Sequence, residues 1–317
     1  MMKLLILLLV SLHVTFAQPL QMPTAQYKCS GGVTDMFIDD GKLYAATNVG
    51  SVDIFDLQTH KKIKRITVAK IKDFMGDMVE SKIYSIDIMD DQLLILSQAQ
   101  SGFRRVDIFD GKKMHHIIDA SEQLSIAQAK FLDKDTVLLA LLSNELIAFD
   151  LQSKSQRYRV QISQSKFSDF ALNEQKDKVA VADESGDIKL VYTKDGVKYK
   201  VLSGQNLDNV FDLAYKNGII ATAGQDRRVV VYDTHLGSAY HIQSGFLVYS
   251  VGLSPSGKLV AYSSNERNDV VVFLRTTKSQ KGVFGGNKMT LTKIVFLDEA
   301  NLFVASDDLF INQYKIK

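Results

Sequence analysis

The sequence predicts an all-β fold in which seven similar sheets close into a ring, a seven-bladed β-propeller. Three observations support this prediction. A short aromatic strand pattern recurs seven times, most recurrences are about 40 residues apart, and each repeat has the same order of apolar and polar strands. A period of roughly 40 to 45 residues made of short strands is typical of propeller blades.

The recurring element is a strand of the form Val-Asp-Ile-Phe-Asp, which ends at Asp56 and again, unchanged, at Asp110. Successive aromatic residues of this element are separated by 54, 40, 43, 40, 41 and 41 positions. The seven aromatic residues are Phe55, Phe109, Phe149, Tyr192, Tyr232, Phe273 and Tyr314. This regular spacing assigns one aromatic strand to each blade.

Each repeat contains further strands in a constant order. The aromatic strand, which we call strand c, follows an apolar strand b such as 42–47, and an earlier strand a such as 34–38. A more polar strand d follows it, for example 61–68. The turns between strands a and b carry Asp, Gly or Asn, which favour tight turns. We expect strand a to line the centre of the ring and strand d to form its rim.

The last repeat ends at Lys317 directly after its strand c, so it has no strand d of its own. An unpaired sheet edge invites aggregation. Residues 25–31 resemble residues 199–204, which are themselves expected to form a strand d. We therefore expect residues 25–30 to pair with residues near 311–316 and close the ring.

Residues 1–17 have the organisation of a secretory signal peptide. Lys3 precedes the apolar run 4–10, and Thr15-Phe16-Ala17 resembles a small-x-small cleavage site. The apolar run is shorter than the roughly 18 residues that a transmembrane helix requires. We expect an exported, soluble, periplasmic protein in which residues 18–317 form one propeller domain. No lipid anchor and no integral membrane segment after cleavage are expected.

The composition argues against several classes of protein. The formal net charge is +2, with 38 Lys and Arg against 36 Asp and Glu, so the chain lacks the basicity of a dedicated nucleic-acid binder. We therefore expect no nucleic-acid partner. The single cysteine, Cys29, cannot form an intramolecular disulfide. A large apolar core must supply the stability instead.

No motif in the chain indicates catalysis or cofactor binding. His235 and His241 flank a turn between strands c and d, but a zinc site there would need a third ligand. Paired carboxylates such as Asp39-Asp40 recur at turns, as solvated β-turn residues do. Nothing near Cys29 in the sequence plainly activates its thiol. We expect no catalytic residue, no cofactor and no metal.

Residues 25–317 resemble the WD-repeat family of seven-bladed propellers. The strongest match is Ala-Gly-Gln-Asp-Arg-Arg-Val-Val-Val-Tyr-Asp at 223–233, with Asp226 in the turn between strands b and c. Phe-Asp or Tyr-Asp takes the place of the family's Trp-Asp pair at 55–56, 109–110, 149–150 and 232–233. The chain departs from the family in having no tryptophan and no Gly-His pair at the start of a repeat.

Among exported members of the family, the chain looks most like the accessory propeller of bacterial periplasmic nitrate reductase systems. The resemblance consists of the leader-like first 17 residues, the size and seven repeats without tryptophan. It implies a non-enzymatic protein that supports maturation or function of a periplasmic molybdenum enzyme. The implied partner is another periplasmic protein, with the nitrate reductase catalytic subunit or its maturation machinery as candidates.

The family resemblance also implies that the b–c and d–a loops share one face. The long first separation places an insertion loop at 69–82, between a strand d and the next strand a. Phe, Met and Arg are enriched in protein interfaces. On that basis, the expected partner-binding residues on this face are Phe74, Met75, Met78, Phe103, Arg104, Arg105, Arg227, Arg228 and Arg267.

Two other functional classes fit a propeller of this size. One is a propeller enzyme, such as a lactonase-like hydrolase. The other is a scaffold for outer-membrane protein assembly, which would be expected to carry a lipobox and often eight blades. Six Lys and Arg between residues 60 and 72 indicate protection of an outer strand, or else an acidic partner or an anionic membrane surface.

Overall fold

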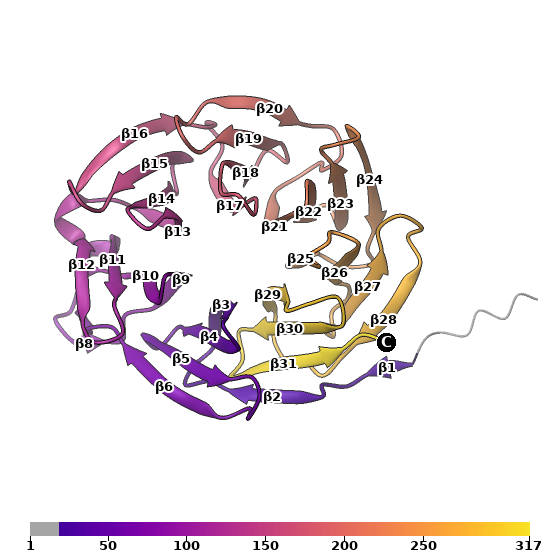
Figure 1. Ribbon diagram of the computed structural model, residues 1–317, viewed down its shortest axis with the longest axis horizontal. Helices are drawn as coiled ribbons and strands as arrows, with labels where there is room; N and C mark the ends of the chain where they lie inside the picture. Colours follow the sequence, from indigo (N-terminus) through magenta and orange to yellow (C-terminus); the bar gives the residue numbers. More distant parts are fainter. Residues whose placement is uncertain (1–18) are drawn as a thin grey trace, which may run out of the picture.

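Seven twisted sheets surround a central channel in the computed structural model (Figure 1). The structure describes residues 19–317, so the predicted signal peptide at 1–17 lies outside the described residues. Strand a of each sheet lies at the channel and strand d at the rim. The predicted all-β, seven-bladed propeller is confirmed.

Blades one to five are each built from four consecutive strands, in the order a to d from the channel outwards. Blade one contains β3 (Val33–Asp39), β4 (Lys42–Thr47), β5 (Ser51–Asp56) and β6 (Lys62–Thr67). Blade two contains β9 (Ile83–Met89), β10 (Gln92–Gln98), β11 (Arg104–Phe109) and β12 (Met114–Ile118). Blade three contains β13 (Ile126–Asp133), β14 (Thr136–Leu141), β15 (Glu145–Asp150) and β16 (Ser155–Gln161).

The second half of the ring follows the same order until the last blade. Blade four contains β17 (Phe167–Leu172), β18 (Lys178–Asp183), β19 (Ile188–Tyr192) and β20 (Lys198–Leu202). Blade five contains β21 (Val210–Lys216), β22 (Ile219–Gly224), β23 (Arg228–Asp233) and β24 (Ser238–Gln243). Blade six contains β25 (Val251–Leu253), β26 (Leu259–Ser263), β27 (Val270–Leu274) and β28 (Gln280–Phe284). Blade seven contains β29 (Leu291–Phe296), β30 (Asn301–Ser306) and β31 (Phe310–Lys315).

The start of the described chain completes blade seven, as the sequence predicts. Strand β2 (Ala25–Lys28) pairs antiparallel with β31, so that Ala25 lies opposite Gln313. Tyr27 of β2 is 1% exposed, and its ring centroid lies 5.4 Å from that of Phe55 in blade one. Its hydroxyl donates to Gln313 Oε1 at 2.8 Å and lies 2.8 Å from His60 Nδ1. Closure therefore joins blades seven and one by side-chain packing as well as by backbone pairing.

A second contact of the same segment was not predicted. Strand β1 (Leu20–Gln21) pairs in parallel with β28, at Val283 and Phe284, and gives blade six a fifth strand. Residues 20–28, which we call the N-terminal arm, therefore run along the rims of two neighbouring blades (Figure 1).

The apolar core is divided among the interfaces between blades. Each buried cluster in the described chain draws its residues from two adjacent blades. Between blades two and three, for example, Leu94 and Leu96 pack with Phe131 and Leu139. The inner strands are covered on both faces, which explains why they read as nearly continuous runs of Val, Ile, Leu and Ala.

Polar side chains also connect neighbouring inner strands. In five blades the side chain at one equivalent position of strand a accepts a hydrogen bond from a backbone N–H of the next blade, at 2.9 to 3.1 Å. The acceptors are Asp35, Ser85, Gln128, Asp169 and Asp212, and the donors are Ile86, Ala129, Phe170, Leu213 and Val251. The three buried aspartates of this set therefore fasten one blade to the next.

Candidate functional site

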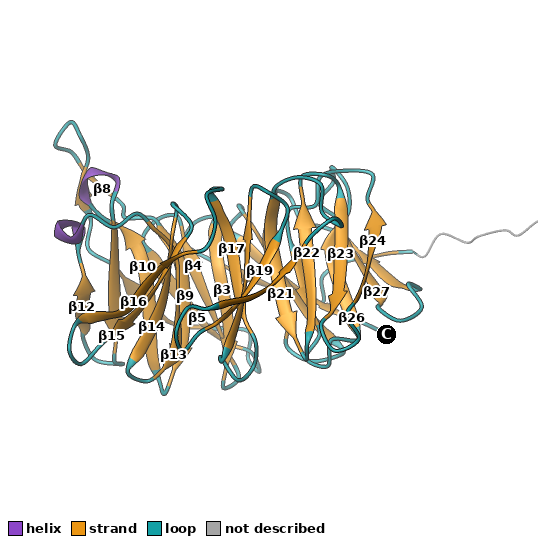
Figure 2. Ribbon diagram, turned by 90° about the horizontal axis from the view of Figure 1, so that it is seen from above, coloured by secondary structure: helices purple, strands orange, loops and turns teal. Residues whose placement is uncertain are grey.

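The propeller has two unequal faces. Strand a runs from the face that carries the b–c and d–a connections, which we call the upper face, to the lower face. All the predicted partner-binding residues lie in or next to upper-face connections. The most prominent upper-face feature is a projection between blades one and two, near the label β8 in Figure 2.

This projection is the predicted insertion loop at 69–82, and it contains regular secondary structure. Strands β7 (Ile71–Lys72) and β8 (Met78–Val79) pair antiparallel and form a short hairpin. Asp73 Oδ1 accepts hydrogen bonds from the backbone N–H groups of Met75 and Asp77, both at 2.9 Å. The carboxylate thereby fixes the turn at the tip of the hairpin.

The hairpin presents apolar side chains to solvent. Phe74 is 98% exposed, Met75 75% and Met78 56%, whereas Ile71 at the root is buried. Large apolar residues gathered at one exposed site mark interaction surfaces more often than isolated ones do. A groove of about 480 Å³ runs between this hairpin and residues 98–102 of blade two. Phe103, partly buried, follows directly after this groove.

The two arginines after Phe103 have different roles. Arg104 lies with its guanidinium 4.0 Å from the centroid of the Tyr84 ring, and its Nη1 donates to the Gly102 carbonyl at 2.6 Å. The Arg105 side chain is only 13% exposed, and its Nε lies 2.9 Å from the buried carboxylate of Asp107. Its Nη2 also donates to the Ala69 carbonyl at 3.1 Å, at the root of the hairpin. Arg105 therefore supports the fold and is not a free contact residue.

The remaining predicted contact residues lie elsewhere on the upper face. Arg227 is exposed in the b–c turn of blade five, and Arg228 donates from Nη1 to the Gln205 carbonyl at 2.7 Å. Arg267 of blade six is exposed and pairs with Asp269 at 3.1 Å. Blades five and six lie across the ring from the hairpin (Figure 1). The structure therefore brings Phe74, Met75, Met78, Phe103 and Arg104 to one region, with Arg105 beneath them, whereas Arg227, Arg228 and Arg267 lie elsewhere.

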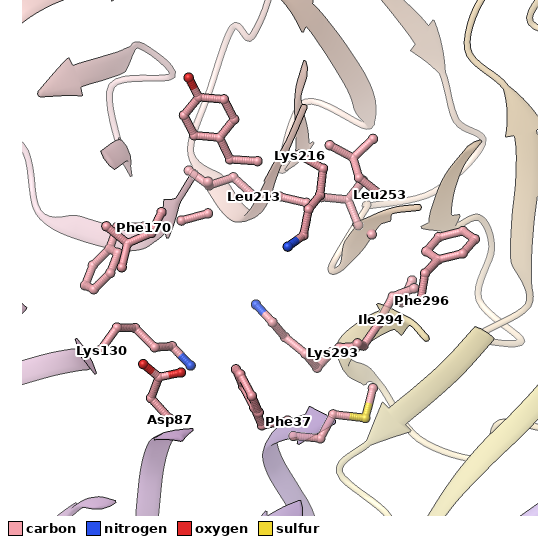
Figure 3. A pocket seen from close by; sticks show the side chains of 18 of the residues that line it. Phe37, Asp87, Lys130, Phe170, Leu213, Lys216, Leu253, Lys293, Ile294 and Phe296 are labelled. Atoms are coloured by element: carbon pink, nitrogen blue, oxygen red, sulfur yellow. The ribbon is translucent and has the colours of Figure 1, made fainter. Parts of the chain in front are cut away.

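Sequence reasoning missed a cavity in the central channel. It has a volume of about 410 Å³ and is lined by the lower halves of the inner strands. Figure 3 shows Phe37, Phe170, Ile294 and Phe296 around this space, with lysine side chains directed into it. The lining continues to Glu174 and Lys216, so the cavity reaches the lower face.

Acidic and basic groups lie in and next to this cavity. Lys293 Nζ lies 2.9 Å from Asp212 Oδ1, and Lys130 Nζ donates to the Ile86 carbonyl at 2.6 Å. Burial raises the pKa of Asp169 to about 7; the nearby Lys293 opposes this shift and Asp212 adds to it. The carboxylates near Lys293 hold its pKa above the ordinary lysine value, although burial acts in the opposite direction. Lys293 therefore keeps its positive charge.

The sequence did contain a signal for this channel. One polar residue stands at the equivalent place in most inner strands, as in Asp35, Gln128, Asp169, Asp212 and Lys293. Aligning the seven repeats on strand a would have shown this set, because the residues recur near the blade period. The aromatic residue of strand c was the stronger pattern, and it aligned the repeats on strand c instead of strand a.

His235 and His241, considered above for a metal site, make hydrogen bonds with protein groups, and Cys29, considered for thiol chemistry, is buried. His241 Nδ1 lies 3.2 Å from Gln205 Oε1, and the His235 backbone N–H donates to Asp233. Within residues 19–317, no group of three or more His, Cys, Asp or Glu is placed to hold a metal ion. Burial raises the pKa of the Cys29 thiol to about 12, so it stays protonated at neutral pH. The same part of the chain contains no helix that is long and apolar enough to cross a membrane.

Comparisons with known proteins support the architecture. No family model matches the sequence, and no curated protein matches it. The β-propeller domain of Cps50 (Swd1) from Myceliophteria thermophila superposes with a TM-score of 0.73, over 93% of this chain and 99% of that domain. The two chains share the fold. Their sequence identity is 15%, and 1855 solved chains match the structure, so this likeness concerns the fold alone.

Proposed function

We propose that this protein is a non-enzymatic scaffold that binds another protein through the upper-face hairpin. The observation that carries the proposal is the exposure of Phe74 and Met75 at the tip of a hairpin whose turn is already fixed by Asp73. A preformed apolar tip loses little conformational entropy on binding, which favours affinity. The partner should offer a concave apolar pocket to receive it.

The neighbouring residues fit the rim of such an interface. Phe103 and Arg104 follow the groove at the base of the hairpin, and Arg104 is already stacked on Tyr84. Aromatic residues and arginine are enriched among the residues that dominate binding energy. Phe74 and Met75 would enter the partner's pocket, while Arg104 would contact polar groups around it.

The carboxylates of the channel favour a scaffold over a hydrolase. Asp35, Asp169 and Asp212 each accept a backbone N–H from the next blade, and Lys293 pairs with Asp212. Acid–base catalysis requires a carboxyl group within reach of a substrate proton. These groups instead hold the blades together.

We also propose that the scaffold acts in the periplasm, as an accessory factor of a nitrate reductase system. Two sequence features support this assignment: the leader-like residues 1–17, and the likeness to exported accessory propellers without tryptophan. The first partners to test are the catalytic subunit and its maturation machinery.

The test is co-purification of the tagged protein with the nitrate reductase catalytic subunit of the same organism. We expect the double variant Phe74→Asp/Met75→Asp to retain at least tenfold less subunit than the wild type, because two charges would have to enter an apolar pocket. Leu236→Asp is the matched control: Leu236 is 78% exposed in a lower-face turn, and this variant should bind normally. Melting curves establish that all variants are folded.

Two results would contradict parts of this proposal. Normal binding by the hairpin variant, together with loss of binding in Arg227→Glu/Arg267→Glu, would place the interface on blades five and six. Failure of the wild type to retain either the catalytic subunit or its maturation proteins would overturn the assignment to this system.

A further inference from the structure

The cavity on the lower side of the channel has the size of a ligand site. Its volume of about 410 Å³ falls within the roughly 300 to 1,000 Å³ typical of small-molecule pockets. Its walls are the paired inner strands of the blades. This makes it a preformed site in the rigid part of the molecule.

The lining is largely apolar. Phe37, Phe170, Leu213, Ile294 and Phe296 surround the space shown in Figure 3. An apolar body placed among these side chains would be removed from water, at a gain of about 25 cal/mol per Å² of buried apolar surface.

Basic side chains point into the same space. Figure 3 shows the amines of Lys130, Lys216 and Lys293 directed towards the cavity. A lysine ammonium has three N–H donors. Lys293 uses one of them on Asp212, and the side chain of Lys216 has no hydrogen bond or ion pair within residues 19–317. Donors therefore remain for an anionic oxygen.

Three carboxylates line the cavity: Asp35 and Asp87 are largely buried, and the exposed Glu174 accepts the Asn217 N–H at its lower end. The side chains of Asp35, Asp87 and Asp212 are at most 9% exposed, whereas Lys130 and Lys293 are 18% and 26% exposed. The oxygens of Asp35 and Asp212 already accept hydrogen bonds from the backbone of the next blade. A ligand in the cavity would therefore meet amines and aromatic rings more than carboxylates.

We propose that this cavity binds a small organic monocarboxylate with an apolar body. Its carboxylate would lie between Lys216 and Lys293, and its apolar body would lie against Phe37 and Phe296. A single negative charge fits better than a phosphate, because Asp35 and Asp87 offset part of the positive charge of the lysines. The site lies on the side opposite the hairpin, so it stands independently of the proposed partner-binding role.

The same chemistry has two sources, a free carboxylic acid and the C-terminal carboxylate of a peptide that ends in an apolar residue. Calorimetric titration of the full mature chain distinguishes them. The first arm compares 4-phenylbutyrate with 4-phenylbutan-1-ol, which has the same apolar body and no charge. The second arm compares a tetrapeptide ending in Phe with its C-terminal amide.

We expect an acid to bind at least tenfold more tightly than its neutral counterpart, in one arm or in both. We expect Lys216→Gln to weaken binding by about tenfold, the size of one charge-assisted hydrogen bond. Lys216 is exposed and unpaired in the described chain, so its replacement should not disturb folding. Lys281→Gln is the matched control: Lys281 is an exposed lysine on the outer strand β28 and should leave binding unchanged.

Binding of 4-phenylbutyrate assigns the site to free acids, and binding of the peptide acid alone assigns it to chain termini. The proposal is overturned if acids and neutral compounds bind equally, or if Lys216→Gln binds like Lys281→Gln. It is also overturned if no ligand of either arm shows saturable binding at millimolar concentration.

Discussion

The buried acid Asp169 links the stability of the propeller to pH. Its Oδ2 accepts the Leu213 N–H of the next blade at 2.9 Å, and burial raises its pKa to about 7. An aspartate in an unfolded chain has a pKa near 3.9. The folded protein therefore binds this proton more tightly than the unfolded chain does. The contribution of Asp169 to the free energy of unfolding falls as pH rises from about 4 to about 7.

We predict that Asp169→Asn removes this pH dependence. An asparagine oxygen can still accept the Leu213 N–H, but it does not ionise. Relative to the wild type, the variant should gain stability on going from pH 5 to pH 8, by on the order of 1 kcal/mol. Urea unfolding at both pH values measures the difference.

The control for this experiment is Asp208→Asn, because Asp208 is an exposed aspartate. Its stability should follow that of the wild type at both pH values. If Asp169→Asn also ran parallel to the wild type, Asp169 would have an ordinary pKa in the folded protein.

At the scale of elements, strand β2 of the N-terminal arm takes the place of strand d in blade seven. Tyr27 fills the space between Phe55 of blade one and Phe303 of blade seven, with ring centroids 5.4 and 5.9 Å away. The arm therefore contributes packing at the interface between blades seven and one in addition to its backbone hydrogen bonds.

We predict that Tyr27→Ala lowers the free energy of unfolding by about 3 to 5 kcal/mol, as expected for truncating a buried aromatic residue. Tyr27→Phe should cost only about 1 kcal/mol, because it removes the hydroxyl contacts and keeps the ring. Tyr199→Ala is the comparison on an outer strand, where Tyr199 is 36% exposed. Equal losses for Tyr27→Ala and Tyr199→Ala in urea unfolding would show that the arm adds no special stability.

The sequence predicted elements with a clear period and missed those without one. Strand β4 was predicted with its observed ends, and the outer edge of blade seven was assigned to residues 25–30. Strands β1, β7 and β8 have two residues each, too few for any alternation to be recognised. Their pairing depends on neighbours brought near by the fold, as at Gly285, whose N–H donates to the Gln21 carbonyl.

At the scale of the whole molecule, stability is distributed around a ring. Each blade shares an apolar cluster with both neighbours. The two chain ends contribute to stability mainly at the interface between blades seven and one. The C-terminus lies on the same side of the ring as β1 (Figure 1). The interface between blades seven and one, where the two chain ends meet, is therefore packed like the other interfaces between blades.

We predict that the chain tolerates a new opening at the hairpin tip. A circular permutant would join Lys317 to Pro19 through a flexible linker and begin at Gly76. Its melting temperature should stay within about 4 °C of the wild type, because the cut falls at an exposed tip. It should also lose the partner, since Phe74 and Met75 would no longer lie in a fixed turn.

A second permutant, opened between Ile54 and Phe55 inside β5, is the control and should fail to fold. Both residues belong to buried clusters at the two interfaces of blade one. Similar melting temperatures for the two permutants would contradict the view that intact sheets carry the stability.

The function of the molecule was less predictable than its shape. Blade number followed from the aromatic period, whereas the candidate contacts depended on whether residues far apart in sequence meet in space. Arg104 and Phe74 lie on the same side of the ring, but Arg227 and Arg267 do not. Arg105 looked identical to Arg104 in sequence, and only the position of the buried Asp107 distinguishes the two.

The sealing of the last blade also has a consequence for biosynthesis. Gln26 and its partner Asn312 are 286 positions apart in the chain. At roughly 5 to 20 residues per second, the ribosome needs about 15 to 60 s to make the segment between them. Throughout that interval strand β2 has no pairing partner, and it is free to pair with the open edge of blade seven in another copy. Crowded nascent chains should therefore exchange these strands and form swapped dimers, whereas dilute ones should close upon themselves.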